Sequence, residues 1–318
     1  MATAIAHPNI ALVKYWGKQV GPGNLPATPS LSITVAGLTT TTRVEAAERD
    51  SLCINGKVRR DSKVEALLDA MRNVFDLPPL GIETRNDFPT GAGLASSASG
   101  FAALVTAIDG EFDLGMSPTQ RSTWARQGSA SAARSIFGGF ATLAARDDNW
   151  TGTELLAKEA WPLEAVVAVT AETPKPVSSS EGMERSRTTS PFYDAWCRST
   201  EADFETACRA VTNRDFGSLS AVAEHSCLKL HALMLASRPA LFYWNQATIA
   251  AMETIRRLRD AGTPVFYTID AGPQLKAVCA PGHRGAVAAL LAKSPGVLRV
   301  VRGGLGDGAR VVNDPRSS

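Results

Sequence analysis

The stretch NDFPTGAGLASSASG, residues 86–100, is the most informative segment of the chain. It is a run of glycine, alanine and serine that leads directly into the apolar sequence FAALVTAID. Backbone N–H groups at a helix start point outward and the helix dipole favours anions, so the segment predicts a loop that cradles phosphate groups ahead of a helix. It is not a GxxxxGK[ST] loop, because no lysine follows the glycines. The alternative is a tight turn that packs a helix against a sheet.

Outward from this loop, the pattern predicts an alternation of strands and helices. Residues 3–14 and 30–45 are rich in β-branched residues and indicate strands on either side of a loop at 21–24. A second small-residue segment, RQGSASAARSIFGG at 126–139, indicates another loop followed by a helix. Between the strand segment 30–45 and the loop at 86–100, apolar residues at helical spacing predict an amphipathic helix from residue 61 to residue 75. Its apolar face consists of Val64, Leu67, Leu68, Met71 and Val74.

The second half of the chain follows a polar, serine-rich segment. Residues 175–193 read KPVSSSEGMERSRTTSPFY and predict a mobile loop, so we place a domain boundary there, between residues 1–172 and 173–318. Helical periodicity returns at 194–236, 245–261 and 285–293, and VFYTIDAG at 265–272 indicates a strand that meets a turn. The C-terminal half is therefore expected to be α+β.

Composition narrows the class of protein. The chain has 318 residues, of which 44% are hydrophobic and 20% charged, enough apolar material for a sizeable interior and for two domains with a cleft between them. Lys and Arg total 33 against 31 Asp and Glu, so the weak net charge argues against nucleic acid as a partner.

Cysteines and hydropathy indicate a cytoplasmic location. The five cysteines are scattered without a CxxC pair, which favours buried thiols in a reducing compartment over disulfides or a metal site. The N-terminus lacks the pattern of a secretion signal. No apolar stretch approaches the roughly 20 residues of a membrane helix, so no membrane partner is expected.

Four sequence blocks together resemble a known family. PTGAGLASSA at 89–98 is similar to the phosphate-loop signature of the GHMP kinase superfamily. HPNIALVKYWGK at 7–18, GSASAARSIFGG at 128–139 and YTIDAGP at 267–273 resemble, in order and spacing, blocks of the diphosphomevalonate decarboxylases within that superfamily. The resemblance covers nearly the whole chain. It implies an α+β GHMP kinase fold, with an N-terminal domain like domain 2 of ribosomal protein S5 and a ferredoxin-like C-terminal domain.

The resemblance also implies an activity. Members of the family bind ATP and a phosphorylated 3-hydroxy acid, phosphorylate its tertiary hydroxyl, and then release phosphate and CO₂ to leave an alkene. Asp270 matches the family's catalytic acid or base, a role worth about 10² to 10⁴ in rate. Arg134 matches the arginine that holds the substrate carboxylate, which a planar guanidinium binds bidentately. Lys14 and Ser97 complete the catalytic set, and Ser97 is also the expected Mg²⁺ ligand.

The remaining expected contacts divide between the two ligands. The hydroxy acid is assigned Tyr15, Lys18, Lys63, Ser129, Ser131 and Arg134. The nucleotide is assigned the phosphate loop and the serine-rich segment, namely Pro89, Gly91, Gly93, Leu94, Ala95, Ser96, Ser97, Lys175, Ser178 and Ser179. The expected cofactors are ATP and Mg²⁺, and relatives suggest a homodimer.

Each residue also has a plain structural explanation. Asp270 before Ala-Gly-Pro is typical of a turn or cap, and Arg134 of a surface salt bridge. Ser129 and Ser131 are typical helix caps. Lys14 and Lys18 are equally typical of a solvated pair beside a core tryptophan.

Some positions depart from the family. LPATPSLSIT at 25–34 has Thr28 and Pro29 where relatives carry Asn or Asp with adjacent serines, and Gln274 replaces the usual Asn with Lys276 close by. Lys63 stands in for a diphosphate-binding Arg. These changes leave the phosphorylation state of the substrate open, so 5-phosphomevalonate and 3,5-bisphosphomevalonate are alternatives to 5-diphosphomevalonate. A mevalonate 3-kinase that does not decarboxylate and a non-catalytic binding protein are the other hypotheses.

Overall fold

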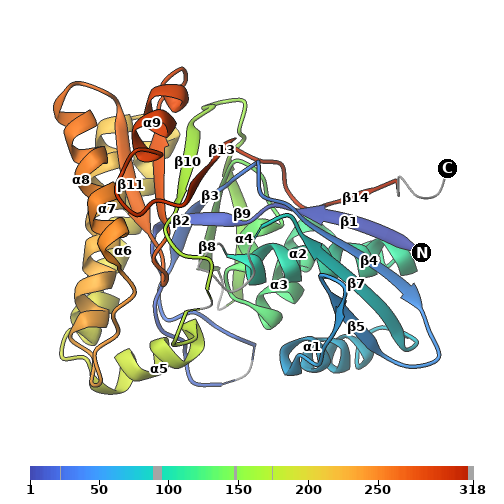
Figure 1. Cartoon of the computed structure of the whole chain (residues 1–318). Coiled ribbons are helices and arrows are strands. Elements are labelled where there is room, and N and C mark those ends of the chain that lie inside the picture. Colours follow the sequence, from blue (N-terminus) through green and yellow to red (C-terminus); the bar gives the residue numbers. More distant parts are fainter. Residues whose placement is uncertain (22, 89–94, 147–148, 174, 314–318) are drawn as a thin grey trace.

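The computed structural model describes residues 1–21, 23–88, 95–146, 149–173 and 175–313. These residues form a mixed α/β structure in which the strands are arranged in three sheets. Figure 1 shows the N-terminal strands with α1, α2 and α3 on one side and the long helices α6, α7 and α8 on the other. Within the described residues, no helix is long and apolar enough to cross a membrane.

The first sheet has the order β14-β1-β4-β7-β5-β6 and joins the two ends of the chain. Its strands are β1 (Ala2–Ala6), β4 (Thr40–Ala46), β5 (Ser51–Ile54), β6 (Lys57–Val58), β7 (Leu80–Asn86) and β14 (Arg310–Val312). The C-terminal strand β14 pairs antiparallel with β1, so the chain returns to its starting point (Figure 1).

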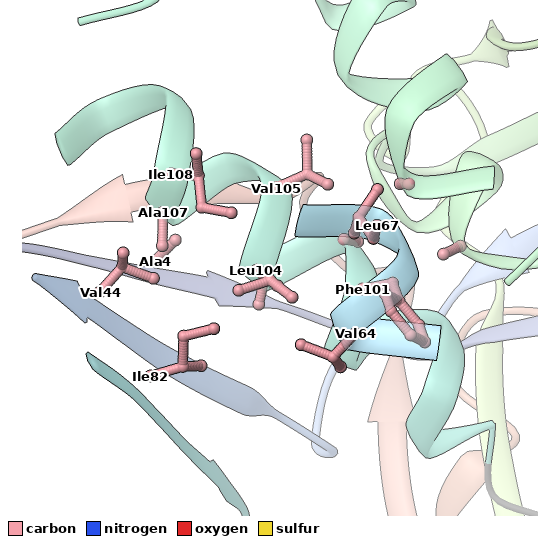
Figure 2. Packing of buried hydrophobic residues seen from close by; sticks show 14 of the residues in the cluster. Ala4, Val44, Val64, Leu67, Ile82, Phe101, Leu104, Val105, Ala107 and Ile108 are labelled. Atoms are coloured by element: carbon pink, nitrogen blue, oxygen red, sulfur yellow. The ribbon is translucent and has the colours of Figure 1, made fainter. Parts of the chain in front are cut away.

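Helix α2 (Ser96–Phe112) covers this sheet, as predicted for the segment after the phosphate loop. Its residues Phe101, Leu104 and Ile108 pack against side chains of the strands, among them Ala4, Val44 and Ile82 (Figure 2). Apolar burial on one face of the sheet therefore fixes the position of α2, and with it the helix start that follows the predicted phosphate loop.

The predicted amphipathic helix is α1 (Ser62–Arg72), capped at its start by the Asp61 side chain. Val64, Leu67, Leu68 and Met71 are buried as expected. Val74 is 66% exposed, contrary to the prediction, because the helix ends at Arg72 and Val74 no longer follows its periodicity.

Two further sheets share one core. The second has the order β2-β3-β8-β9 and the third β11-β12-β10-β13. Their strands are β2 (Asn9–Val13), β3 (Ser30–Thr34), β8 (Phe140–Arg146), β9 (Asn149–Leu156), β10 (Glu164–Val169), β11 (Val265–Ile269), β12 (Leu275–Cys279) and β13 (Arg299–Gly304). One hydrophobic cluster draws on both sheets, with Leu12 and Ile33 from the second and Val167 and Val278 from the third.

Helices complete this core. They are α6 (Tyr193–Asn213) and α7 (Phe216–Leu235), which contribute Val211 and Leu219 to the cluster. Helices α8 (Gln246–Asp260) and α9 (Arg284–Leu291) pack in a separate cluster on the other face of the third sheet. Helices α3 (Pro118–Gly128) and α4 (Ala132–Ser135) pack with α2 in the cluster of the first sheet. The helices and the strand predicted beyond residue 193 are thus confirmed. The predicted helix at 194–236 divides in two, since Arg214 adopts a left-handed conformation and Asp215 caps α7.

The serine-rich segment differs from the prediction. Residues 179–189 form helix α5 (Ser179–Thr189) and not a loop. The Ser178 side chain accepts a hydrogen bond from the N–H of Glu181, which supplies the missing N-cap. Glu181 and Arg185 form an ion pair one turn apart, and Gly182 lies against Trp16 on the buried side. The high serine content therefore belongs to the cap and the buried face of a helix.

Candidate active site

Five segments that are distant in sequence line one cavity of about 300 Å³. They include the end of β2 with the residues that follow it, the start of α2, the α3–α4 connection with α4, the start of α5 with the residues ahead of it, and the turn after β11. Lys63 at the start of α1 and Leu230 of α7 also line the cavity. The predicted site residues in the described part of the chain all line this cavity: Lys14, Tyr15, Lys18, Lys63, Ala95, Ser96, Ser97, Ser129, Ser131, Arg134, Lys175, Ser178, Ser179 and Asp270. Pro89, Gly91, Gly93 and Leu94 lie outside the described residues.

Asp270 follows the end of β11, in a turn closed by a hydrogen bond from the N–H of Gly272 to its carbonyl. Its carboxylate forms ion pairs with Lys14 through Oδ1 and with Lys276 through Oδ2, the latter at 2.9 Å. The two lysine side chains are 2% and 3% exposed, whereas that of Asp270 is 27% exposed toward the cavity. Asp270 therefore does more than form a turn, because its side chain pairs with two buried lysines and reaches the cavity.

Electrostatics keep this carboxylate ionised. Burial alone would raise the pKa of Asp270, but the ammonium groups of Lys14 and Lys276 outweigh it and hold the pKa well below its ordinary value. Burial lowers the pKa of Lys276, and Asp270 opposes that shift. A carboxylate in this setting is a fixed negative charge near neutral pH.

Lys14 is held in place by the backbone around it. Its Nζ donates to the carbonyl of Ala11 at 2.8 Å, and its own N–H donates to the Ser226 hydroxyl of α7 at 3.0 Å. The neighbouring Cys227 Sγ accepts from the N–H of Ile269 at 3.2 Å, which ties α7 to the residue before Asp270. The interpretation of Lys14 as a solvated lysine is wrong, whereas Trp16 is the expected core residue at 2% exposure.

Arg134 lies on α4 and is 1% exposed, so the interpretation as a surface salt bridge is also wrong. Its guanidinium donates to the Ser32 hydroxyl at 3.0 Å, to Asn9 Oδ1 at 3.2 Å and to the Ser30 hydroxyl. Burial lowers its pKa to about 10. These neutral acceptors orient the cation without cancelling its charge. The Tyr15 ring lies 5.8 Å from the guanidinium carbon.

Serine hydroxyls connect the start of α2 with the α3–α4 connection. Ser97 Oγ is 3.5 Å from Ser129 Oγ, which is 3.1 Å from Ser131 Oγ. Ala95, just ahead of α2, adopts a left-handed backbone with φ of 56°. Ser131 stands at the start of α4 without a side-chain capping bond, and Ser129 follows the end of α3. Both hydroxyls thus lie at the cavity and not in an N-cap.

Lys18 and Lys63 also line the cavity. Lys18 Nζ donates to Asn24 Oδ1 at 2.7 Å and to the Ser180 hydroxyl at 3.4 Å. Burial, followed by the charge of Lys63, lowers the pKa of Lys18. Like charges that face one cavity favour an anionic ligand between them.

Lys175 reaches the cavity from the segment ahead of α5. Its Nζ donates to the Ser179 hydroxyl at 2.6 Å and to the carbonyl of Ala271, next to Asp270, at 2.9 Å. Burial lowers its pKa to about 8. Asp270 is the one carboxylate among the described residues that line the cavity, against the cations of Lys14, Lys18, Lys63, Arg134 and Lys175. The cavity therefore suits a polyanion that also carries a carboxylate.

Sequence reasoning missed several residues that shape the site. Asn9 lies in the quoted block 7–18, and Ser30 and Ser32 alternate along β3 as inward-facing hydroxyls, so position and alternation were usable signals. Lys276 was noted only as a nearby cation. Gln274 is buried and structural, since its side chain accepts from the N–H of Thr170 at 2.7 Å.

Family models match most of the chain. Residues 6–154 match the diphosphomevalonate decarboxylase-like N-terminal domain, and residues 165–294 match the mevalonate 5-diphosphate decarboxylase C-terminal domain. The chain is 36% identical over 305 residues to the diphosphomevalonate decarboxylase of Aspergillus fumigatus, covering 86% of this chain and 75% of the relative. It is 34% identical over 301 residues to that of Saccharomyces cerevisiae, covering 86% and 76%.

Solved structures agree with these matches. The structure of MDDEF in complex with MVAPP, AMPPCP and magnesium aligns with a TM-score of 0.89 and 34% identity, covering 98% of this chain and 99% of the other. The mevalonate diphosphate decarboxylase of Staphylococcus aureus aligns with a TM-score of 0.90 and 32% identity, covering 98% of both chains. Sequence, fold and cavity thus lead to one conclusion, that the chain belongs to the diphosphomevalonate decarboxylase family.

Proposed function

We propose that the chain catalyses the ATP-dependent decarboxylation of (R)-5-diphosphomevalonate to isopentenyl diphosphate, with release of ADP, phosphate and CO₂. The observation that carries the proposal is the pairing, in one cationic cavity, of an ionised Asp270 with a buried Arg134 that has only neutral hydrogen-bond acceptors. The family membership and the complex of a relative with MVAPP and AMPPCP support the same reaction.

Asp270 and Lys14 are assigned to the 3-hydroxyl of the substrate. An anchored carboxylate oxygen beside an ammonium can orient the hydroxyl and accept its hydrogen bond as it attacks the γ-phosphorus of the nucleotide. The low pKa of Asp270 makes orientation and charge stabilisation its main contribution, because a weak base takes up a proton only late in the transfer.

Arg134 is assigned to the substrate carboxylate. Its side chain is fixed by Ser30, Ser32 and Asn9. The guanidinium can therefore hold the substrate carboxylate, and with it the C–C bond that breaks, in one orientation without moving during the reaction. The Tyr15 ring lies beside the guanidinium on the same wall of the cavity. As the tertiary phosphate leaves with the electron pair of its C–O bond, the electron pair of the breaking C–C bond forms the alkene and the carboxylate departs as CO₂.

The cationic rim is assigned to the phosphates. Lys18 and Lys63, with the hydroxyls of Ser129 and Ser131, are proposed to hold the diphosphate of the substrate. Ala95, Ser96, Ser97, Lys175, Ser178 and Ser179 are proposed to bind ATP, because they surround the N-terminal ends of α2 and α5, where anions are favoured.

ATP and Mg²⁺ fit this chemistry. The Ser97 hydroxyl at the start of α2 is an oxygen donor suited to Mg²⁺, which typically keeps waters and phosphate oxygens as its other ligands. When bound, the metal neutralises phosphate charge and the nucleotide supplies the phosphoryl group.

The finer architecture belongs to the same proposal. We assign residues 1–172 to a domain like domain 2 of ribosomal protein S5 and residues 173–318 to a ferredoxin-like domain. We also propose that two copies of the chain form a homodimer. Strand β10, at the end of residues 1–172, pairs with β12 and β13 and so belongs to the sheet of the C-terminal half.

A panel assay tests the substrate assignment. The enzyme with ATP and Mg²⁺ is given mevalonate, 5-phosphomevalonate, 5-diphosphomevalonate and 3,5-bisphosphomevalonate in parallel, and both ADP and CO₂ are recorded. The proposal expects both products from 5-diphosphomevalonate. Products from another member of the panel would reassign the substrate, and ADP without CO₂ would make the protein a 3-kinase.

A further inference from the structure

Lys276 occupies a position on β12 where the strand pattern calls for an apolar residue. Leu275, Ala277 and Cys279 point into the cluster on one face of the third sheet, and Val278 points into the cluster on the other face. Lys276 shares the face of Val278, and its cross-strand neighbours are Val167 and Thr268. Alternation along the strand therefore directs an ammonium group into the core.

A lysine in such a place is costly for folding. Its side chain is 3% exposed, and a buried charge must be compensated by partners, whereas an apolar residue of similar volume would fill the site without that cost. A buried lysine in an otherwise apolar strand is expected where function requires it.

Lys276 approaches Asp270 from the side away from the substrate. Asp270 lines both the large cavity and a small one of about 10 Å³ behind it. Lys14 lines the large cavity, whereas Lys276 lines the small one, together with apolar residues such as Val167 and Leu38. The carboxylate thus forms part of the wall between the two, with one ammonium on each side.

We infer that Lys276 is a positioning residue that fixes Oδ2 of Asp270 from behind, so that Oδ1 and Lys14 are presented to the 3-hydroxyl in one geometry. The inference rests on the proposed function for its kinetic consequences. In this arrangement Lys276 does not touch the substrate. It restricts rotation of the carboxylate and keeps that carboxylate ionised at a distance of 2.9 Å.

Other charged and titratable groups around Asp270 determine how far its pKa can move. Lys14 just after β2, Lys175 from the segment ahead of α5 and Arg134 from α4 all favour the ionised form. From α7, burial lowers the pKa of His231 to about 3 and raises that of Cys227, so both are neutral between pH 4 and pH 8. Loss of Lys276 should therefore raise the pKa of Asp270 without making the carboxyl neutral at pH 7.

The test compares Lys276→Met with Val278→Ala, a packing change on the same face of the same strand. Lys276→Met removes the charge at similar volume and should lower kcat about 10²-fold, as displaced catalytic groups do, with little change in the KM for ATP. The acid limb of the pH profile of kcat should move to higher pH, because a carboxyl with a raised pKa loses its charge earlier on acidification. Val278→Ala should lower the unfolding temperature and leave the acid limb in place.

A second readout is independent of turnover. Protein labelled with [4-¹³C]aspartate is titrated by NMR, and the Asp270 resonance is identified by its loss in Asp270→Asn. The midpoint should move to higher pH in Lys276→Met and, should that variant not fold, in Lys276→Gln. If the wild type turned over no hydroxy acid, the proposed function would fail while this titration still decided the role of Lys276.

The inference is overturned by any of three results. They are an Asp270 midpoint that does not move, a wild-type kcat in Lys276→Met, or equal kinetic losses in Lys276→Met and Val278→Ala with unchanged pH profiles.

Discussion

At the residue scale, the site combines one carboxylate with several cations, and each buried cation is held by a distinct set of partners. Arg134 is oriented by neutral oxygens of Ser30, Ser32 and Asn9, whereas Lys14 is paired with Asp270. A guanidinium with its charge intact is free to bind an incoming carboxylate, and a paired lysine is not. This difference underlies the proposed division of the substrate, with its carboxylate assigned to Arg134 and its hydroxyl to the Asp270–Lys14 pair.

Arg134→Lys tests this division. A lysine keeps the charge but loses the planar fork, so kcat/KM for the hydroxy acid should fall about 10- to 100-fold, the loss expected for one or two charge-assisted hydrogen bonds. Steady-state kinetics with each substrate varied in turn measures the effect, and the KM for ATP should change little. Arg299→Lys, on an exposed part of β13, is the matched control. An unchanged kcat/KM in Arg134→Lys would remove the residue from carboxylate binding.

The pKa of Lys175 predicts how nucleotide binding depends on pH. With its pKa lowered to about 8 in the free protein, the amine loses its charge as the pH rises above that value, and a phosphate loses its partner. The dissociation constant of AMPPCP should increase by up to about tenfold per pH unit above pH 8. Calorimetric titrations at pH 7, 8 and 9 measure it.

Lys175→Met should bind the nucleotide more weakly at pH 7 and should lose the dependence on pH. Lys293→Met, at an exposed position after α9, should behave as the wild type. A wild-type affinity that stays constant from pH 7 to pH 9 would contradict the role of Lys175.

Sequence reasoning predicted Asp270, Lys14 and Arg134 as site residues, and all three line the cavity, but it gave Lys276 no role. The reason is physical. The first three lie in sequence blocks typical of the family. Lys276 lies in an otherwise apolar strand, and whether its side chain points to solvent or into the core depends on which strands flank it. Periodicity along one strand does not contain that information.

At the scale of elements, helix α5 places Lys175 and the serines at its N-terminus against the cavity. The helix is anchored by a close approach to the segment after β2, because Gly182 lies against Trp16 and Tyr243. A Cβ at Gly182 would stand 2.9 Å from Trp16 Cζ2, closer than real Cβ contacts, and 3.0 Å from the Tyr243 hydroxyl, closer than most.

Gly182→Ala should therefore displace α5 and weaken both nucleotide binding and turnover. Overpacking of this kind costs about 1–3 kcal/mol, which exceeds the gain from replacing glycine by alanine in a helix. Thermal unfolding and the KM for ATP report the change. Gly285→Ala in α9, where a Cβ meets open space, should be neutral or slightly stabilising. Equal behaviour of the two variants would show that α5 tolerates the extra carbon.

The same helix shows the limit of composition as a guide. Residues 175–193 read as a loop because serine and polar residues dominate, yet Ser178 caps the helix and Ser186 is buried against Trp16 Nε1 at 2.9 Å. A serine hydroxyl that bonds to the nearby backbone favours a helix start and disfavours a helix interior. Ser178 makes such a bond at the start of α5, and the hydroxyl of the interior Ser186 bonds to Trp16 and Ser237 instead.

At the scale of the whole molecule, the two halves are tied together in two ways. The cluster between the second and third sheets contains Leu12 and Ile33 from the first half and Phe266 and Val278 from the second. The terminal strand β14 also pairs with β1. The mixture of helices and strands in the C-terminal half could be predicted from the sequence. The pairing of β14 with β1 could not, because three residues are too few to show a strand pattern.

These ties predict a single cooperative unfolding transition despite two matching family domains. Because the hydrophobic cluster between the second and third sheets is shared, unfolding of one half would expose apolar residues of the other. Differential scanning calorimetry should show one peak, with equal calorimetric and van't Hoff enthalpies. Two separated transitions would contradict a common core.

The central claim is that one site first phosphorylates the hydroxy acid and then decarboxylates it. The most direct measurement follows 5-diphosphomevalonate labelled at its carboxyl carbon through turnover with ATP and Mg²⁺, with ADP and labelled CO₂ quantified in the same sample. The account predicts one CO₂ for each ADP, with both rates lost in Asp270→Asn. ADP released without CO₂, or CO₂ released without ADP, would contradict it.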